Sequence, residues 1–259
     1  MRKRKTSDIF FENTKLKKGT DYKIKDVDYN ISKTSYKKGC DYYTLFDIKS
    51  LMTFDENLKM KLTYLLKNEI REYIKKLKIK ANSVLVVGLG NKNMVADCLG
   101  DKVVEKVLAT RQFDGILDKN RFSEVSCYSL GVFGKTGIET ASVVKKLQEL
   151  VGAELVIVVD TFVTKKLFRF NKSLQLSSCG ISPGAGVDNA RKYINYDFLG
   201  VPVFSMGVPL LFDYGKKDLV VMDKEIEKYV KFFSDILSMG INISINKNIS
   251  IKEMKQLIY

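Results

Sequence analysis

Short apolar runs alternate with amphipathic stretches along the chain after residue 80. The apolar runs have the length and composition of buried strands and cover residues 84–87, 125–132, 155–159 and 203–206. The amphipathic stretches carry apolar residues at helical spacing and cover residues 100–112, 137–150 and about 223–238. Strands that alternate with helices favour a mainly parallel, twisted sheet with helices on both faces. We therefore predict an α/β protein with three α/β/α layers.

The first 80 residues have a different pattern. Residues 21–31 and 42–48 alternate between apolar and polar side chains around a turn-like segment at 37–40, which predicts a hairpin or a small accessory sheet. Residues 55–78 carry one apolar stripe at helical spacing, and Asp55 suits the N-cap of that helix. We divide the chain into a small β-rich N-terminal appendage (1–51), an α/β domain (52–240) and a C-terminal tail with weak helical signals (241–259).

The amino-acid composition limits the kinds of catalytic and metal site that the chain can form. The 259 residues contain no histidine, which excludes Ser-His-Asp and Cys-His nucleophiles and every metal site that needs imidazole. We expect no metal and no cofactor, and acid–base work by carboxylates. No apolar stretch is long enough to cross a membrane and no signal peptide is recognisable, so a cytoplasmic protein without a membrane partner is expected. The four cysteines are widely spaced and are expected to be buried free thiols: Cys40, Cys98, Cys127 and Cys179.

The charge is strongly basic and unevenly distributed. The formal net charge is +14, and residues 1–80 hold 21 lysines and arginines against 11 acids. Such an excess can attract nucleic acid or an acidic protein, or can simply form a solvated face. The lysines are dispersed and no nucleic-acid-binding motif accompanies them, so we favour the solvated face and expect no direct nucleic-acid partner.

Two acids are candidates for catalysis. Asp97 follows the strand and tight turn of VLVVGLGN and precedes a helix, and Asp160 follows the apolar run LVIVV. Both would lie at the carboxyl edge of a parallel sheet, where clefts form. Two close carboxylates do not both ionise easily, so the pair can share a proton, activate water and protonate a leaving group. The alternative is structural: either acid caps a helix, or Asp160 pairs with Lys165 or Arg169.

The glycine-rich segments do not indicate a nucleotide. GLGNKN lacks the third glycine of the dinucleotide fingerprint, and GVFGKT (131–136) lacks the first glycine of a phosphate-binding loop. The segment CGISPGAGVDNARK (179–192) is a constrained loop. Its backbone N–H groups and Arg191 can bind a substrate carbonyl or carboxylate, or the loop can be a structural crossover that needs glycine.

Five segments, in order, resemble the germination protease family over about 125 residues. They are VLVVGLGN with its trailing DCLGDKVVEKVLATR, FGKTGIETA (133–141), ELVIVVDTF (154–162), RFNKSLQLSSCGISPGAGVDNARK (169–192) and LGVPVFSMGVP (199–209). TSDIFFEN (6–13) is similar to the family's self-cleavage segment, and GCDYYTLFDI (39–48) to its early strand. The candidate substrate-binding residues in these segments are Gly90, Asn91, Gly137, Glu139, Gly180, Gly184 and Arg191.

The resemblance implies an endopeptidase that degrades small acid-soluble spore proteins when spores germinate. It implies an atypical aspartic mechanism with Asp97 and Asp160 as its two acids, and a phosphorylase/hydrolase-like core similar to hydrogenase maturation proteases. Family members are typically homotetramers of the forespore, made as zymogens. The alternative is a weakly active or inactive homologue that acts as a sporulation-associated binding protein.

The resemblance also places self-cleavage between an acidic and an aliphatic residue, a pattern that Asp8 and Ile9 fit. Removal of residues 1–8 would remove a basic cluster that can hold an acid of the cleft ionised, so we hypothesise that this pro-segment restrains activity. The alternative is an inert tail.

The chain departs from the family pattern at several points. Val95 and Ala96 replace the usual Thr-Pro before the first acid, and Ser178 and Ser182 stand where family loops have Asp and His. The family's helix-rich C-terminal portion is largely missing.

Overall fold

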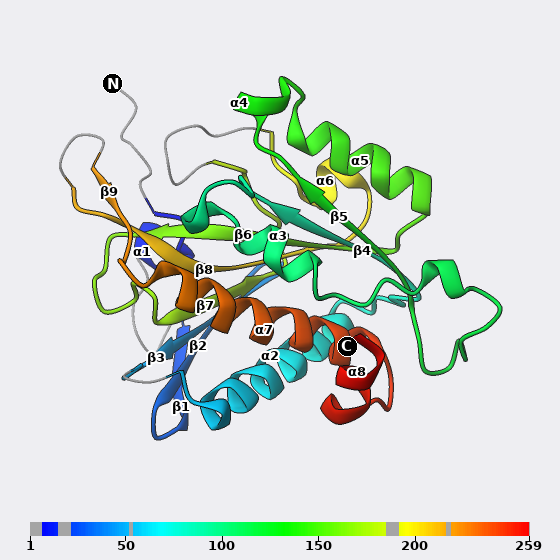
Figure 1. Ribbon diagram of the computed structural model, residues 1–259, viewed down its shortest axis with the longest axis horizontal. Coiled ribbons are helices and arrows are strands. Elements are labelled where there is room, and N and C mark those ends of the chain that lie inside the picture. The colour runs from blue at the N-terminus through cyan, green and yellow to red at the C-terminus, as the bar shows by residue number, and fades with distance from the viewer. Residues whose placement is uncertain (1–6, 15–21, 52–53, 185–191, 216–218, 259) are drawn as a thin grey trace.

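One mixed sheet runs through the whole structure. The computed structural model describes residues 7–14, 22–51, 54–184, 192–215 and 219–258. Within these residues nine strands form one sheet in the order β1-β2-β3-β7-β8-β6-β4-β5, with β9 (Val220–Val221) paired to β8. Helices cover both faces of this sheet, as Figure 1 shows, so the predicted α/β class is confirmed.

The parallel half of the sheet carries the buried strands expected from the sequence. The order is β5 (Glu124–Leu130), β4 (Ser83–Leu89), β6 (Leu155–Thr164) and β8 (Val203–Asp213), and each adjacent pair is parallel. The apolar runs bury side chains on both faces of these strands, because helices cover each face. The carboxyl ends of β4, β5 and β6 therefore lie at one edge of the sheet.

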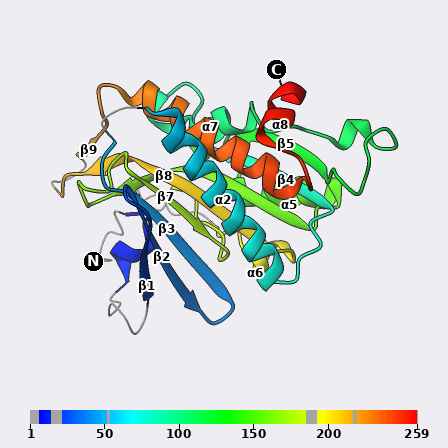
Figure 2. The ribbon, with the colours of Figure 1, turned by 90° about the horizontal axis from the view of Figure 1, so that it is seen from below.

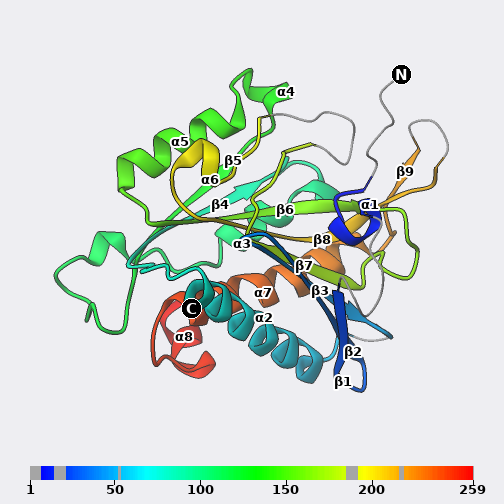
Figure 3. The ribbon, with the colours of Figure 1, turned by 180° about the vertical axis from the view of Figure 1, so that it is seen from behind.

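The other half of the sheet is antiparallel. β7 (Ser173–Ser177) pairs with β8, and β3 (Asp41–Ile48), β2 (Ile31–Lys38) and β1 (Tyr22–Asp28) follow in a meander, visible in Figures 2 and 3. The expected β-rich appendage thus has three strands instead of two. It extends the main sheet through the pairing of β3 with β7 and is not a separate accessory sheet.

Two apolar layers pack against the sheet. On one face lie α2 (Glu56–Lys76), α3 (Leu99–Val104) and α7 (Ile226–Ile245). Figure 1 shows α2 and α7 below the sheet. On the other lie α5 (Thr140–Val151) and α6 (Tyr196–Leu199), above it. The Asp55 side chain accepts hydrogen bonds from the N–H groups of Asn57 and Leu58, so the predicted N-cap of α2 is present. In the described residues no helix is both long and apolar enough to span a bilayer.

The helix predicted at 100–112 is wrong in its second half. α3 ends at Val104, and a 3₁₀ turn (Arg111–Phe113) follows only after an irregular stretch. The reason is tertiary: the N–H of Leu108 donates to the Asn242 side chain, and the N–H of Thr110 donates to the carbonyl of Val125. These partners take the donors that a continuing helix would need.

The end of the chain is more regular than its composition suggests. α7 continues to Ile245, so residue 240, where we placed the boundary of the tail, lies inside a helix. α8 (Ile251–Ile258) then packs back through the fully buried Met254. Asn242 and Asn246, which read as tail-like in the sequence, are buried and bonded to backbone groups of the loops that precede β5. A buried amide with partners is compatible with a core helix.

All four cysteines are free, but they are not all buried. Cys98 is buried, Cys127 and Cys179 are partly exposed, and Cys40, in the turn between β2 and β3, is exposed. The expectation of free thiols is confirmed, and that of uniform burial is wrong for Cys40.

Candidate active site

The turn after β4 positions Asp97. Helix α3 approaches β4 so closely that a Cβ on Gly88 would lie 2.2 Å from the carbonyl oxygen of Gly100. The chain then turns at Gly90, whose φ of +121° L side chains rarely adopt. The N–H of Asn91 donates to Asp97 Oδ2 (2.8 Å) and to the Asp97 carbonyl (3.0 Å). Burial raises the pKa of Asp97 above its ordinary value, and the Asn91 N–H opposes that shift.

Asp160 lies within β6. The strand does not end at residue 159 as expected but continues to Thr164, because β8 stays paired with it as far as Phe212. Asp160 Oδ1 accepts a hydrogen bond from the N–H of Thr161 (2.8 Å). Burial raises the pKa of Asp160 well above 3.8, and the negative charges of Asp97 and Asp8 raise it further.

Both acids line one cleft of about 280 Å³. Its walls come from the turn after β4, the segment after β5, the start of α5, and β6 itself, so it lies at the carboxyl edge of the parallel strands. Apolar side chains and glycines form much of the lining, among them Leu89, Leu130, Phe133 and Leu211. This is a partly apolar cleft in which few polar groups other than carboxylates converge.

A third acid in this cleft comes from the N-terminal segment. Asp8 lines the cleft, its N–H donates to the carbonyl of Val163 (2.9 Å), and its Oδ2 accepts from the N–H of Val163 (2.9 Å). Our sequence hypothesis gave this segment the role of bringing cations to the cleft. The part of it that the structure describes brings an anion, and the basic cluster at residues 2–5 lies outside the described residues.

Arg169 does not pair with Asp160, so this part of the structural alternative for Asp160 is wrong. Arg169 pairs with Glu12 (3.3 Å) and with Asp47 (3.4 Å). The pattern of acids and apolar residues did not single out Glu12, since its partners Thr164, Lys165 and Arg169 are more than 150 residues away along the chain.

Comparison with known proteins identifies the family. The germination protease family profile matches residues 2–216. The chain belongs to the germination protease family. It is 32% identical to the germination protease of Caldanaerobacter subterraneus subsp. tengcongensis, over 92% of this chain and 88% of that protein. The germination protease of Bacillus subtilis is 35% identical over 79% of this chain and 56% of its own length.

The family assigns the activity of the chain. It is a germination endopeptidase, a hydrolase of peptide bonds. Among solved structures, the [NiFe] hydrogenase maturation protease HycI of Thermococcus kodakarensis aligns with 60% of this chain and 92% of its own, at a TM-score of 0.34 and 14% identity. A likeness of that size carries no weight for the mechanism of this family member.

The candidate substrate-binding residues of this germination protease do not all reach the cleft. Gly90 and Gly184 line it, and Asn91 acts through its N–H on Asp97. Glu139 directly precedes Thr140, which lines the cleft, and Glu139 Oε1 is buried with no hydrogen-bond partner in the described part of the chain.

The remaining candidates lie elsewhere. Gly137 is exposed at the end of the short helix α4 (Phe133–Thr136) and is absent from the lining of the cleft. Gly180 is also absent from it, and a Cβ there would lie 2.0 Å from the carbonyl of Ile194. Arg191 lies outside the described residues. Ser178, one of the departures from the family pattern, accepts a hydrogen bond from the N–H of Tyr42 (2.9 Å) and helps to join β7 to β3.

Proposed function

We propose that this germination protease cleaves peptide bonds with the carboxylate pair Asp97 and Asp160. The observation that carries the proposal is their convergence in one cleft, where the charge of Asp97 is among the causes that raise the pKa of Asp160. Asp160 is the protonated member, because burial and two neighbouring acids oppose its ionisation. Asp97 is the ionised member, because the Asn91 N–H stabilises its carboxylate.

In this mechanism Asp97 removes a proton from a water molecule, and the water oxygen attacks the carbonyl carbon of the substrate. Asp160 donates its proton as the bond between carbon and nitrogen breaks, so the amine leaves in neutral form. The proton taken up by Asp97 returns to Asp160 through solvent, and the pair regains its starting state. A pair that shares one proton can therefore supply both the base and the acid.

The proposed substrates are small acid-soluble spore proteins, degraded at germination in the spore core. Self-cleavage between Asp8 and Ile9 is proposed as the activation step of a zymogen. Its support is that Asp8 lines the same cleft as the two catalytic acids. Assembly as a homotetramer is proposed from the family resemblance, and light scattering after gel filtration measures it.

The deciding experiment is digestion of a purified α/β-type spore protein, followed by sequencing of the fragments. Asp97→Asn and Asp160→Asn are expected to abolish cleavage while circular dichroism stays that of the parent. Asp114→Asn, which changes an exposed acid paired with Lys119, is the matched control and is expected to cleave at the parent rate. Full activity of either cleft variant would refute the carboxylate pair.

A further inference from the structure

One edge of β6 lies open beyond Val159. β4 pairs with β6 only as far as Val159, whereas β8 pairs with the opposite edge as far as Thr164. Asp160 is therefore the first residue of a stretch of strand that has a partner strand on one side only. On the open side, Val163 bonds to Asp8 through both its N–H and its carbonyl, and Ser7 Oγ donates to the same carbonyl (3.3 Å).

The contact between Asp8 and Val163 is an incomplete strand pairing. The N–H of Asp8 meets the carbonyl of Val163, as in a sheet, but the N–H of Val163 meets the Asp8 carboxylate instead of a main-chain carbonyl. A backbone N–H that bonds to a carboxylate makes a charge-assisted hydrogen bond. This edge thus binds both a main-chain N–H and an acidic side chain of the same residue.

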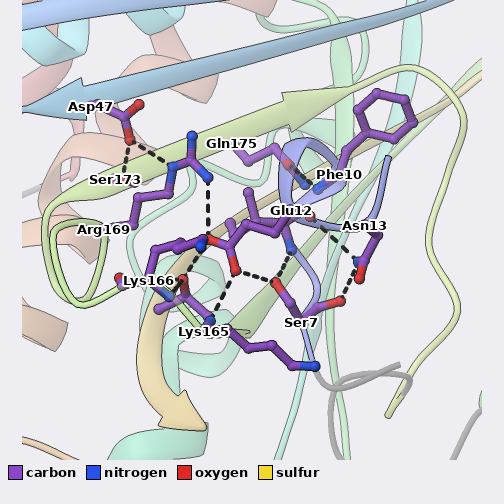
Figure 4. A network of polar contacts seen from close by, with 12 residues as sticks. Ser7, Phe10, Glu12, Asn13, Asp47, Lys165, Lys166, Arg169, Ser173 and Gln175 are labelled. Atoms are coloured by element: carbon purple, nitrogen blue, oxygen red, sulfur yellow. Dashed lines mark hydrogen bonds and ion pairs between the residues drawn. The ribbon is translucent and has the colours of Figure 1, made fainter. Parts of the chain in front are cut away.

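The residues after Asp8 are held by additional contacts, and Ser7 is joined to them: its Oγ accepts from the N–H of Ile9 (3.1 Å) and donates to Glu12 Oε2 (2.9 Å). Ile9 is fully buried against Leu45 and Phe162, and the ring of Phe10 stacks on Tyr43 with centroids 3.8 Å apart. The Glu12 side chain is 2% exposed; it accepts from Thr164 Oγ1 (2.6 Å) and from the N–H of Lys165 (2.9 Å). Figure 4 shows Glu12 between Lys165 and Arg169, and Arg169 in turn reaches Asp47.

We propose that a protein substrate binds as an added strand on this open edge of β6, with one of its acidic side chains received by the N–H of Val163. This inference rests on the proposed function and identifies the substrate-recognition element of the same site. Extended peptides commonly bind by adding a strand to an exposed sheet edge, where main-chain hydrogen bonds supply affinity and side-chain contacts supply specificity. Ser7 and Asp8 occupy this position in the structure, so they compete with the substrate, whereas residues 9–13 stay docked.

The test measures amide hydrogen exchange at single residues in the full-length chain with Asp160→Asn, which is expected to bind peptide without turnover. Adding Asp8→Ala is expected to accelerate exchange at Val163 about tenfold, because its N–H loses its acceptor. Exchange at Lys165, whose N–H bonds to Glu12, is expected to stay slow and shows that residues 9–13 remain docked.

The probe is then acetyl-Thr-Ser-Asp-amide, which copies residues 6–8. At saturation it is expected to restore slow exchange at Val163 in the Asp8→Ala chain. Acetyl-Thr-Ser-Ala-amide, the matched control, is expected to leave exchange fast. If amide exchange at Lys165 also becomes fast in the Asp8→Ala chain, the proposal stands only if the acidic peptide still slows exchange at Val163.

Two results overturn the inference: no change at Val163 on adding the acidic peptide, or equal protection by the alanine peptide. Either result, combined with normal cleavage of a spore protein by the parent chain, refutes the recognition edge and leaves the carboxylate pair intact. Protection by the acidic peptide alone, in a parent chain that cleaves nothing, supports the edge and refutes the proposed catalysis.

Discussion

Replacement of Gly90 by alanine tests how Asp97 is held. Gly90 has a φ of +121°, and a Cβ there would lie 2.0 Å from the carbonyl oxygen of Asp97 and 3.2 Å from its Oδ1. Real Cβ atoms do not approach an atom closer than 3.0 Å, so the Asp97 carbonyl must move by about 1 Å. That movement breaks the two hydrogen bonds from the Asn91 N–H.

The magnitude follows from two contributions. A residue with a side chain in this backbone conformation costs about 1–3 kcal/mol. Loss of a hydrogen bond to a carboxylate costs about 1.5–3 kcal/mol more. We therefore expect Gly90→Ala to lower the free energy of unfolding by roughly 2.5–6 kcal/mol. Misplacement of a catalytic group by about 1 Å is expected to reduce the rate of spore-protein cleavage by about 10²-fold.

The assay is urea unfolding, combined with the initial rate of spore-protein cleavage at one pH. Gly115→Ala is the matched control: Gly115 has a φ of +79°, and a Cβ on this residue would have no atom within 4 Å. It isolates the conformational cost and is expected to leave the cleavage rate unchanged. If Gly90→Ala is no less stable than Gly115→Ala and cleaves at the parent rate, the steric argument for Asp97 is refuted.

Three further predictions concern other parts of the molecule. Asp160 binds its proton more tightly in the folded than in the unfolded chain, so its contribution to stability is present at low pH and is lost as the pH rises above about 4. Urea unfolding of Asp160→Asn is therefore expected to show a higher free energy of unfolding than the parent, by an amount that grows from pH 4 to pH 7. A difference that stays constant with pH would contradict the raised pKa. Ile9→Ala is expected to lower the free energy of unfolding by about 2–5 kcal/mol, because Ile9 is fully buried. The control Ile116→Ala changes a residue that is 78% exposed and is expected to alter the free energy of unfolding little. Equal effects of the two substitutions would mean that the N-terminal segment contributes nothing to the core. Desolvation raises the pKa of the partly exposed Cys127 thiol to about 12, so iodoacetamide at pH 8 is expected to label the exposed Cys40 first, as peptide mass mapping would show. Preferential labelling of Cys127 would contradict its raised pKa.

Local sequence determined the elements that surround the two proposed catalytic acids. The apolar runs at 84–87 and 155–159 lie within β4 and β6, and the stripe at 55–78 forms α2 with its predicted N-cap. Hydrophobic periodicity indicates which face of a helix or strand is buried, and it predicted these elements because each of them buries several apolar side chains. The strand–helix alternation then placed Asp97 and Asp160 at the same edge, since parallel strands share their carboxyl ends.

Tertiary structure alone decided how the cleft is completed. Asp8 reaches it by bonding to Val163, which is 155 residues away along the chain, and Glu12 meets Arg169 at a separation of 157. The continuation of β6 to Thr164 depends on β8, and the early end of α3 depends on Asn242 from α7. The hydrophobic periodicity of a segment predicts none of these partners, because it shows only which side chains are buried. It does not show which distant residue buries them or bonds to them. The apolar pattern therefore determined the sheet and the edge that carries Asp97 and Asp160. The third acid and the occupied strand edge arose only when the folded chain brought its N-terminal segment back onto β6.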